Sequence, residues 1–281
     1  MTVRIVTDST VDLPQDIVDE LGITVVPLHV FFGDQSYEDG VTITKDEFYS
    51  KLTADGAPTP TTSAPSAGAF VAAYQAARGE ADEIVSIHLS SELSATHTSA
   101  LLGREQSGLP ERIEVMDSGT VSAALGLLVI EAATMAQQGA SRADIVQVVR
   151  ECIPRTWFFG ALGTLEYLRR GGRIGRAAAF LGSILQVKPI IGFHAGAIYP
   201  IERTRGRARA LQRVRQLIAD YGEMAMVAVG HTTDEEGMYA VERFVREYAP
   251  EIEIRRFQCG ATIGTYLGPD AFGLALIQRA V

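Results

Sequence analysis

The 281-residue chain contains only two cysteines, Cys152 and Cys259, which lie far apart and form no Cys-x-x-Cys pair. This scarcity excludes a disulfide framework and a cysteine-based zinc site. No group of His, Cys, Asp and Glu has metal-ligand spacing, and the dispersed Asp8, Asp12 and Asp117 are expected to serve turns and caps. We therefore expect neither a metal nor another cofactor.

Long apolar runs and an excess of positive charge are also missing. No uncharged apolar stretch reaches the length of a membrane span, and the first residues lack the basic and apolar regions of a signal peptide. The net charge of −9 argues against a chain-wide nucleic-acid surface. We expect a cytoplasmic protein with no integral membrane segment and no nucleic-acid partner.

The chain has no Walker A loop and no Rossmann fingerprint, so no motif predicts bound nucleotide. It also lacks the Gly-x-Ser-x-Gly elbow of many serine hydrolases. None of its five histidines belongs to a motif. His88 lies within an apparent strand and is expected in the core or at an edge, whereas His231 follows a strand and is the better functional candidate. A serine hydrolase with Ser63 or Ser94 as the nucleophile stays a disfavoured alternative.

Strand-like apolar runs alternate with helical patterns, which is typical of an α/β fold with much parallel sheet. Strands are expected over residues 3–6, 25–32, 83–88, 113–116, 157–162, 187–193, 197–201, 224–229, 252–257 and 272–277. Helices are expected over residues 66–77, 121–138, 141–152, 165–170, 207–221 and 234–248. The proline-rich stretch 55–65 is expected to be a loop. Thr44-Lys45-Asp46-Glu47 has capping-box spacing, Ser141 is expected to cap the helix over 141–152, and the strands over 187–193 and 197–201 are expected to form a hairpin around Gly196. A change of pattern near Pro154 divides the chain into domains of residues 1–155 and 156–281.

Four hydroxyl-rich segments follow predicted strand ends or lie in loops: Asp8-Ser9-Thr10, Thr61-Thr62-Ser63, Ser90-Ser91 through Ser94-Ala95-Thr96, and Asp117-Ser118. Ligands of parallel α/β sheets bind outside the carboxyl ends of the strands. Hydroxyls and helix N-termini gathered there suit an anion such as a carboxylate. Each hydroxyl taken alone is also explained as an N-cap, but the four together favour one shared site.

Two further segments carry glycine or positive charge. Gly171-Gly172-Arg173-Ile174-Gly175 lets the backbone approach a ligand closely and offers Arg173 as a cation for an anionic head group. The alternative for that segment is a helix C-cap with a surface arginine. Six arginines between Arg203 and Arg215 form either a solvated helix face or a docking surface for an acidic or phosphorylated partner.

Six short motifs occur in order along the whole chain: Ile5-Val6-Thr7-Asp8-Ser9-Thr10-Val11-Asp12-Leu13, Thr62-Ser63-Ala64-Pro65-Ser66, Ser90-Ser91-Glu92-Leu93-Ser94-Ala95-Thr96, Asp117-Ser118, Leu168-Arg169-Arg170-Gly171-Gly172-Arg173-Ile174 and Lys188-Pro189-Ile190. In this order and spacing the chain resembles DegV family proteins. The resemblance implies two α/β domains, the first with a three-layer parallel sheet and the second with a mixed sheet and helices. It also implies a long-chain fatty acid, such as palmitate, held between them.

The resemblance further implies a lipid-binding protein rather than an enzyme, namely the acyl-carrying subunit of bacterial fatty acid kinase, whose ATP-binding subunit is the expected partner. The residues that match the family's carboxylate site are Thr62, Ser63, Ser94, Ala95 and Tyr266. The residues expected near the head group are Gly171, Gly172 and Arg173. The residues that match the kinase-docking region are Arg203, Arg205 and Arg207.

The chain departs from the family pattern at two positions. The family's Ser-Gly-Thr is Ser94-Ala95-Thr96 here, and Tyr266 stands where the family commonly has histidine. A tyrosine hydroxyl still donates a hydrogen bond but carries no charge at neutral pH. Two alternatives therefore stay open. One is a lipid carrier without kinase coupling, and the other is an enzyme subunit resembling the substrate-binding domain of dihydroxyacetone kinase, which binds its substrate covalently through a histidine.

Overall fold

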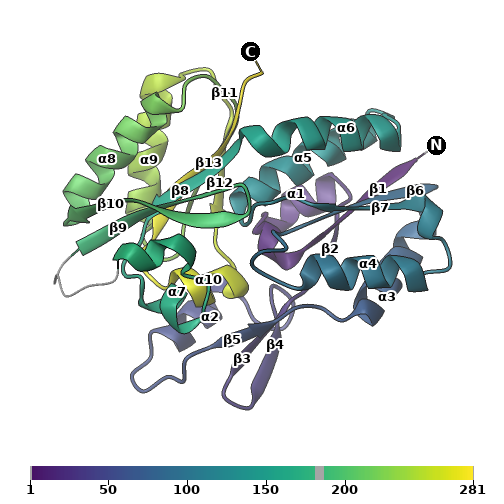
Figure 1. Cartoon of the computed structure of the whole chain (residues 1–281), viewed down its shortest axis with the longest axis horizontal. Coiled ribbons are helices and arrows are strands. Elements are labelled where there is room, and N and C mark those ends of the chain that lie inside the picture. Colours follow the sequence, from purple (N-terminus) through teal and green to yellow (C-terminus); the bar gives the residue numbers. More distant parts are fainter. Residues whose placement is uncertain (1, 181–186, 281) are drawn as a thin grey trace.

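The computed structural model describes residues 2–180 and 187–280, which form three sheets connected by helices (Figure 1). A four-stranded parallel sheet has the order β2-β1-β6-β7, and a six-stranded mixed sheet has the order β10-β9-β8-β13-β11-β12. A third, three-stranded sheet has the order β4-β3-β5. The predicted α/β class is confirmed, with the parallel sheet first in the chain and the mixed sheet second. No helix in the two described ranges is long and apolar enough to cross a membrane.

The parallel sheet lies between two helical layers. Its strands are β1 (Val3–Asp8), β2 (Thr24–Val26), β6 (Glu83–His88) and β7 (Ile113–Asp117). Successive side chains of a strand point to opposite faces. Ile5 accordingly packs with α5 (Ala123–Gln137) and α6 (Arg142–Cys152), while Val6 packs with α3 (Ala67–Arg78) and near α4 (Thr96–Gln106). The shorter helical turns of this half are η1 (Ser9–Val11), α1 (Gln15–Glu20) and η2 (Pro110–Arg112).

The mixed sheet carries helices on its outer face. Its strands are β8 (Thr156–Ala161), β9 (Val187–His194), β10 (Ala197–Arg205), β11 (Met224–His231), β12 (Ile254–Gln258) and β13 (Phe272–Gln278). Phe159 packs on that face with Val214 of α8 (Arg207–Asp220) and Val241 of α9 (Glu235–Tyr248). The predicted hairpin of β9 and β10 is confirmed, and Gly196 supplies the positive φ of its turn.

The inner face of the mixed sheet packs against the half that holds the parallel sheet. Leu128 of α5 shares one core cluster with Ile5 of the parallel sheet and with Ala228 and Ala275 of the mixed sheet. These two alanines, on the neighbouring strands β11 and β13, let the helix approach the sheet closely. The predicted boundary at residues 153–156 falls at η3 (Ile153–Arg155), between α6 and the first strand of the mixed sheet.

The small sheet corrects two predictions. The run 25–32 is not one strand, because Pro27 lacks a backbone N–H and separates β2 from β3 (His29–Phe32). Residues 61–63 of the predicted loop form β5 (Thr61–Ser63), which pairs with β3. The partner β4 (Gln35–Glu38) was not predicted, nor was α4. The capping box of α2 (Lys45–Leu52) is confirmed, since the side chains and backbones of Thr44 and Glu47 bond reciprocally.

Candidate functional site

A cavity of about 170 Å³ lies between the loops of the parallel sheet and the inner face of the mixed sheet. Its apolar lining comes from both halves of the chain and includes Leu28, Leu89, Leu93, Val121, Phe158, Leu168, Ile191, Phe193, Ile198, Ile263 and Leu267. Its polar lining is smaller and consists of Thr62, Ser94, Arg173, Thr262 and Tyr266. Such a space takes a ligand that is apolar over most of its length and polar at one point.

Thr62 and Tyr266 meet at the polar end of this cavity. The Thr62 Oγ1 and the Tyr266 hydroxyl lie 2.7 Å apart, and either atom can donate the hydrogen bond. The Arg173 guanidinium lies 5.4 Å from the centre of the Tyr266 ring and is exposed to solvent. The structure therefore brings together three of the predicted site residues, Thr62, Arg173 and Tyr266. The positive charge of Arg173 lies where the cavity opens.

Strand β5 decides which hydroxyls of its segment reach the cavity. Thr62 and Ala64 line it, whereas Ser63 between them is exposed and does not. This alternation follows from the period of two in a strand. Of the predicted pair, only Thr62 is thus brought together with the other candidate residues.

Ser94 and Ala95 line the cavity at the N-terminal end of α4. The Ser94 Oγ lies 2.9 Å from the Thr96 Oγ1 and accepts a hydrogen bond from the Thr96 amide. Ala95 at the N-cap has no side-chain oxygen, so Ser94 caps the first amide of α4 in its place. Ala95 has a negative φ, which an alanine adopts without strain.

The glycines before Arg173 have separate structural roles. Gly172 has a φ of +67° and ends α7 (Glu166–Arg170), and the next amide, that of Arg173, donates to the Leu168 carbonyl. A Cβ at Gly171 would lie 2.5 Å from the Tyr266 ring, so glycine allows this ring to pack there. The segment is therefore a helix C-cap whose exposed arginine also lines the cavity, and a contact of Arg173 with an anionic head group stays a prediction.

Thr262 and Ile263 belong to α10 (Ala261–Leu267), which the sequence patterns did not predict. Two buried carboxylates from the other half of the chain hold the start of this helix. Asp12 accepts a hydrogen bond from the Gly260 amide at 2.7 Å. Asp39 accepts from the amides of Ala261 at 2.9 Å and Thr262 at 3.1 Å. These contacts fix one wall of the cavity.

Burial dominates the titration of both carboxyl groups. Desolvation raises the pKa of Asp12 from 3.8 to about 7, although the Lys45 ammonium and the hydrogen bonds from Ser122 and Gly260 act to lower it. Desolvation also raises the pKa of Asp39 above its ordinary value. The predicted role of Asp12 in a turn is thus extended to an interaction across the two halves.

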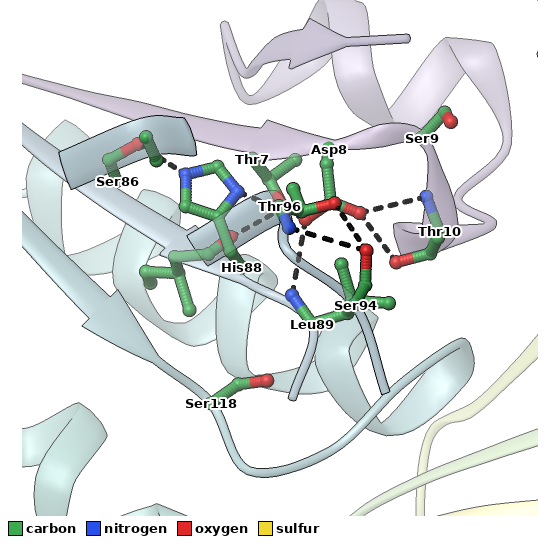
Figure 2. A network of polar contacts seen from close by, with 12 residues as sticks. Thr7, Asp8, Ser9, Thr10, Ser86, His88, Leu89, Ser94, Thr96 and Ser118 are labelled. Carbon is green, nitrogen blue, oxygen red and sulfur yellow. Dashed lines mark hydrogen bonds and ion pairs between the residues drawn. The ribbon is translucent and has the colours of Figure 1, made fainter. Parts of the chain in front are cut away.

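A buried polar network lies behind the loops that follow β1 and β6, and Figure 2 shows how its side chains point toward one another. The His88 Nδ1 lies 2.9 Å from the Asp8 carboxylate, and its Nε2 lies 2.6 Å from the Ser86 Oγ. Asp8 also accepts hydrogen bonds from the amides of Leu89 and Thr10. His88 was expected in the core or at an edge, and the structure shows it in the core.

The chain Ser86, His88 and Asp8 has the residue types of a catalytic triad, but all three side chains are fully buried. None of them lines the cavity, and Tyr74 already donates to the Ser86 Oγ. Among the described residues, Ser94 hydrogen-bonds Thr96 rather than a histidine. The network therefore orders the loops after β1 and β6 and presents no accessible nucleophile.

The expectation that four hydroxyl-rich segments form one site is wrong for two of them. The Ser9 Oγ donates to Asp39, and the Thr10 hydroxyl donates to Asp8. The Ser118 Oγ donates to the Thr120 carbonyl. These side chains are engaged within the protein, because the turns after β1 and β7 need them for their own backbone and neighbours. Only the segments containing Thr62 and Ser94 line the cavity.

The arginines expected to meet a partner divide into two kinds. Arg203 and Arg205 are exposed and line an open groove of about 470 Å³ between β10 and α8, together with Arg209 and Arg213. Arg207 instead forms a bidentate pair with Asp234, at 2.8 and 2.9 Å, at the start of α9. This pair lowers the pKa of the Asp234 carboxyl, so Arg207 has a structural role in addition to any docking role.

His231 is half-buried at the end of β11 and lines a second, smaller cavity, and burial lowers its pKa. Within residues 2–180 and 187–280, no group of three or more His, Cys, Asp and Glu could hold a metal ion.

Comparison with known sequences places this chain in a family. The sequence profile described as "Uncharacterised protein, DegV family" matches residues 2–279. The chain is 38% identical over 283 residues to a DegV domain-containing protein of Caldanaerobacter subterraneus subsp. tengcongensis, with 99% of each chain covered. It is 34% identical over 281 residues to Protein DegV of Bacillus subtilis, with 98% of each chain covered.

Solved structures of similar proteins have the same fold. A fatty-acid-binding DegV family protein from Thermus thermophilus superposes with a TM-score of 0.91 at 32% identity, covering 99% of this chain and 100% of that one. DegV of Bacillus subtilis, described as a fatty acid binding protein, gives a TM-score of 0.88 at 32% identity with the same coverage. A stearic-acid-binding protein from Eubacterium ventriosum gives 0.90 at 27% identity, with 98% of each chain covered.

Proposed function

The chain belongs to the DegV family, and we propose that it binds a long-chain fatty acid in the cavity between its two large sheets. The acyl chain lies along the apolar lining, and the carboxylate lies at Thr62, Ser94 and Tyr266. The observation that supports this most directly is the distribution of polar groups in the cavity. Its hydroxyls and its arginine come from four segments that converge, and the rest of the wall is largely apolar. The protein acts as a carrier and not as a stand-alone enzyme.

The energetics of the cavity agree with such a ligand. Each buried methylene contributes about 0.8 kcal/mol, so the acyl chain supplies most of the affinity. The carboxylate needs hydrogen bonds that offset its desolvation. Hydroxyl donors come from Thr62, Ser94 and Tyr266, and the exposed Arg173 adds a positive charge. Neutral donors hold the carboxylate less tightly than a bidentate arginine would, which leaves it open to modification.

We further propose that a kinase partner converts the bound carboxylate to an acyl-phosphate. The chain has no nucleotide-binding motif, so ATP has to come with the partner. The head-group end is accessible because Ala95 and Arg173 are exposed. The groove of Arg203, Arg205 and Arg209 offers a basic surface for an acidic partner face. Tyr266 in place of histidine favours the second candidate, a lipid carrier without kinase coupling.

Mass spectrometry of the organic extract from purified protein tests the lipid proposal. We expect a co-purified long-chain fatty acid, and its amount should fall in the Ser94→Ala protein because a cavity hydroxyl is lost. Ser91→Ala is the matched control, since Ser91 is exposed and does not line the cavity. An extract without fatty acid, combined with esterase turnover, would favour the hydrolase. Equal retention in wild type and Ser94→Ala would contradict the assigned head-group site.

The partner proposal has its own test. Arg205→Ala should leave fatty-acid retention unchanged and slow acyl-phosphate formation by the kinase, because Arg205 lies in the groove and not in the cavity. Arg215→Ala is the control, as Arg215 lies on α8, outside the groove, and pairs with Glu247. Loss of lipid from the Arg205 variant would refute this division of roles. No acyl-phosphate with any variant, wild type included, would favour the uncoupled carrier.

A further inference from the structure

One row of residues crosses the inner face of the mixed sheet and has three glycines at its centre. Gly160 of β8 pairs with Ile191 of β9 on one side and with Gly273 of β13 on the other. Gly273 pairs with Gly230 of β11, which pairs with Phe257 of β12. Residues paired directly across strands project to the same face. The Phe257 ring covers Gly230, so the bare stretch of sheet lies at Gly160 and Gly273, between the side chains of Ile191 and Phe257.

All five residues of this row line the second cavity, whose volume is about 20 Å³. Its wall is almost entirely apolar, with Leu162, Cys259 and Ala271 among the further lining residues. The cavity shares Phe158, Ile191 and Leu267 with the large cavity. The two spaces are therefore neighbours, and these three side chains lie between them.

The glycine row cannot be filled by its own side chains. A Cβ at Gly273 would lie 2.4 Å from the Phe159 carbonyl oxygen, and one at Gly160 would lie 2.7 Å from that of Phe272. A Cβ at Gly230 would lie 2.1 Å from the Phe257 ring. Protein interiors are normally close-packed, so an apolar gap beside a larger cavity is a place for ligand atoms.

We propose that the terminal carbons of a bound acyl chain lie on the glycine row and that Phe257 sets the longest chain the protein accepts. This inference rests on the proposed fatty-acid binding in the large cavity. A volume of about 20 Å³ holds about one water-sized group, which corresponds to the last one or two carbons. Each added methylene raises the affinity about fourfold while it finds space. Affinity therefore rises with chain length until the methyl end reaches Phe257, and then falls.

Two variants change this space in opposite directions. Ala271→Val adds carbon atoms at a residue that lines the second cavity and not the first. Phe257→Leu opens the far end of the row. Phe159→Leu is the matched control, because Phe159 lies in the same sheet and packs on its outer face against α8 and α9.

The experiment measures the affinity of delipidated protein for dodecanoate, tetradecanoate, hexadecanoate, octadecanoate and eicosanoate. Ala271→Val should lower the affinity for the longest acid that wild type accepts by about fifteenfold, the effect of two methylenes, and leave the shortest acids unchanged. Phe257→Leu should move the optimum to a longer acid, and Phe159→Leu should keep the wild-type profile.

Three results would overturn the inference. One is an unchanged profile in the Ala271 and Phe257 variants, and another is an equal loss at every chain length. Both leave the proposed fatty-acid binding standing, since wild type still binds. A wild-type protein that binds none of the five acids overturns both proposals. Should Ala271→Val fail to fold, the direction of the Phe257→Leu shift decides the matter alone.

Discussion

Tyr266→Phe removes a single oxygen atom from the polar end of the cavity and keeps the aromatic ring. The ring still fills the space that Gly171 leaves and still lies under the Arg173 guanidinium, 5.4 Å from its centre. The hydroxyl is lost, together with its 2.7 Å hydrogen bond to the Thr62 Oγ1. The substitution therefore separates hydrogen bonding by Tyr266 from its packing.

The size of the effect should differ between the empty and the loaded protein. In the empty protein a neutral hydrogen bond is lost, and the half-buried Thr62 can turn to water, so unfolding should become easier by about 1 kcal/mol or less. In the loaded protein the hydroxyl donates to a carboxylate, and hydrogen bonds to charged groups contribute about 1.5–3 kcal/mol. The affinity for hexadecanoate should then fall about ten- to hundredfold.

Titration calorimetry with delipidated protein measures this loss directly, and thermal unfolding without ligand measures the stability. Tyr167→Phe is the matched control, because Tyr167, on α7, packs against Gly268 and does not line the cavity. Equal affinities of wild type and Tyr266→Phe would refute the placement of the carboxylate beside Tyr266. An equal loss in the Tyr167 variant would trace the effect to packing between α7 and α10.

Two further predictions concern stability. The pKa of Asp12, raised from 3.8 to about 7 by burial, means that the folded protein holds this proton more tightly than the unfolded chain. The proton on Asp12 therefore contributes on the order of 4 kcal/mol at most to the free energy of unfolding. This contribution is present below pH 3.8 and is lost as the pH rises through 7. Denaturant titrations over that range should show that the free energy of unfolding varies less in Asp12→Asn than in wild type. Gly172→Ala forces a φ of +67° on a residue with a Cβ, so it should lower the free energy of unfolding by about 1 kcal/mol, seen as a lower melting temperature. Gly171→Ala should also lower the affinity for lipid, because its Cβ meets the Tyr266 ring.

Much of the architecture could be predicted because it depends on local patterns. Apolar runs of strand length, helix caps such as Ser141 and the turn at Gly196 lie within a few neighbouring residues. Pro27 cannot donate to a ladder and so ends β2, although the apolar residues on both sides favour one continuous strand. Strand β5 was missed because Thr61–Ser63 lies among prolines, and pairing with β3 overrides that composition.

The candidate site was only partly predictable because its residues meet through tertiary contacts. The hydroxyl-rich segments were visible as motifs, but the alternation that turns Thr62 inward and leaves Ser63 exposed depends on the pairing of β5. Helix α10 has no capping side chain of its own, since its cap comes from Asp39, more than two hundred residues away. No local pattern reports a contact of that range, so Thr262 could not be assigned to the cavity from the sequence.

The attachment of α10 to Asp12 and Asp39 has a consequence for any recombination of this chain with its relatives. One wall of the cavity is encoded near the end of the chain, yet the carboxylates that anchor it are encoded within the first forty residues. Residues 156–281 expressed alone would leave the amides of Gly260, Ala261 and Thr262 without these acceptors. Chimeras that exchange the segment 258–267 must therefore inherit both aspartates from the same parent.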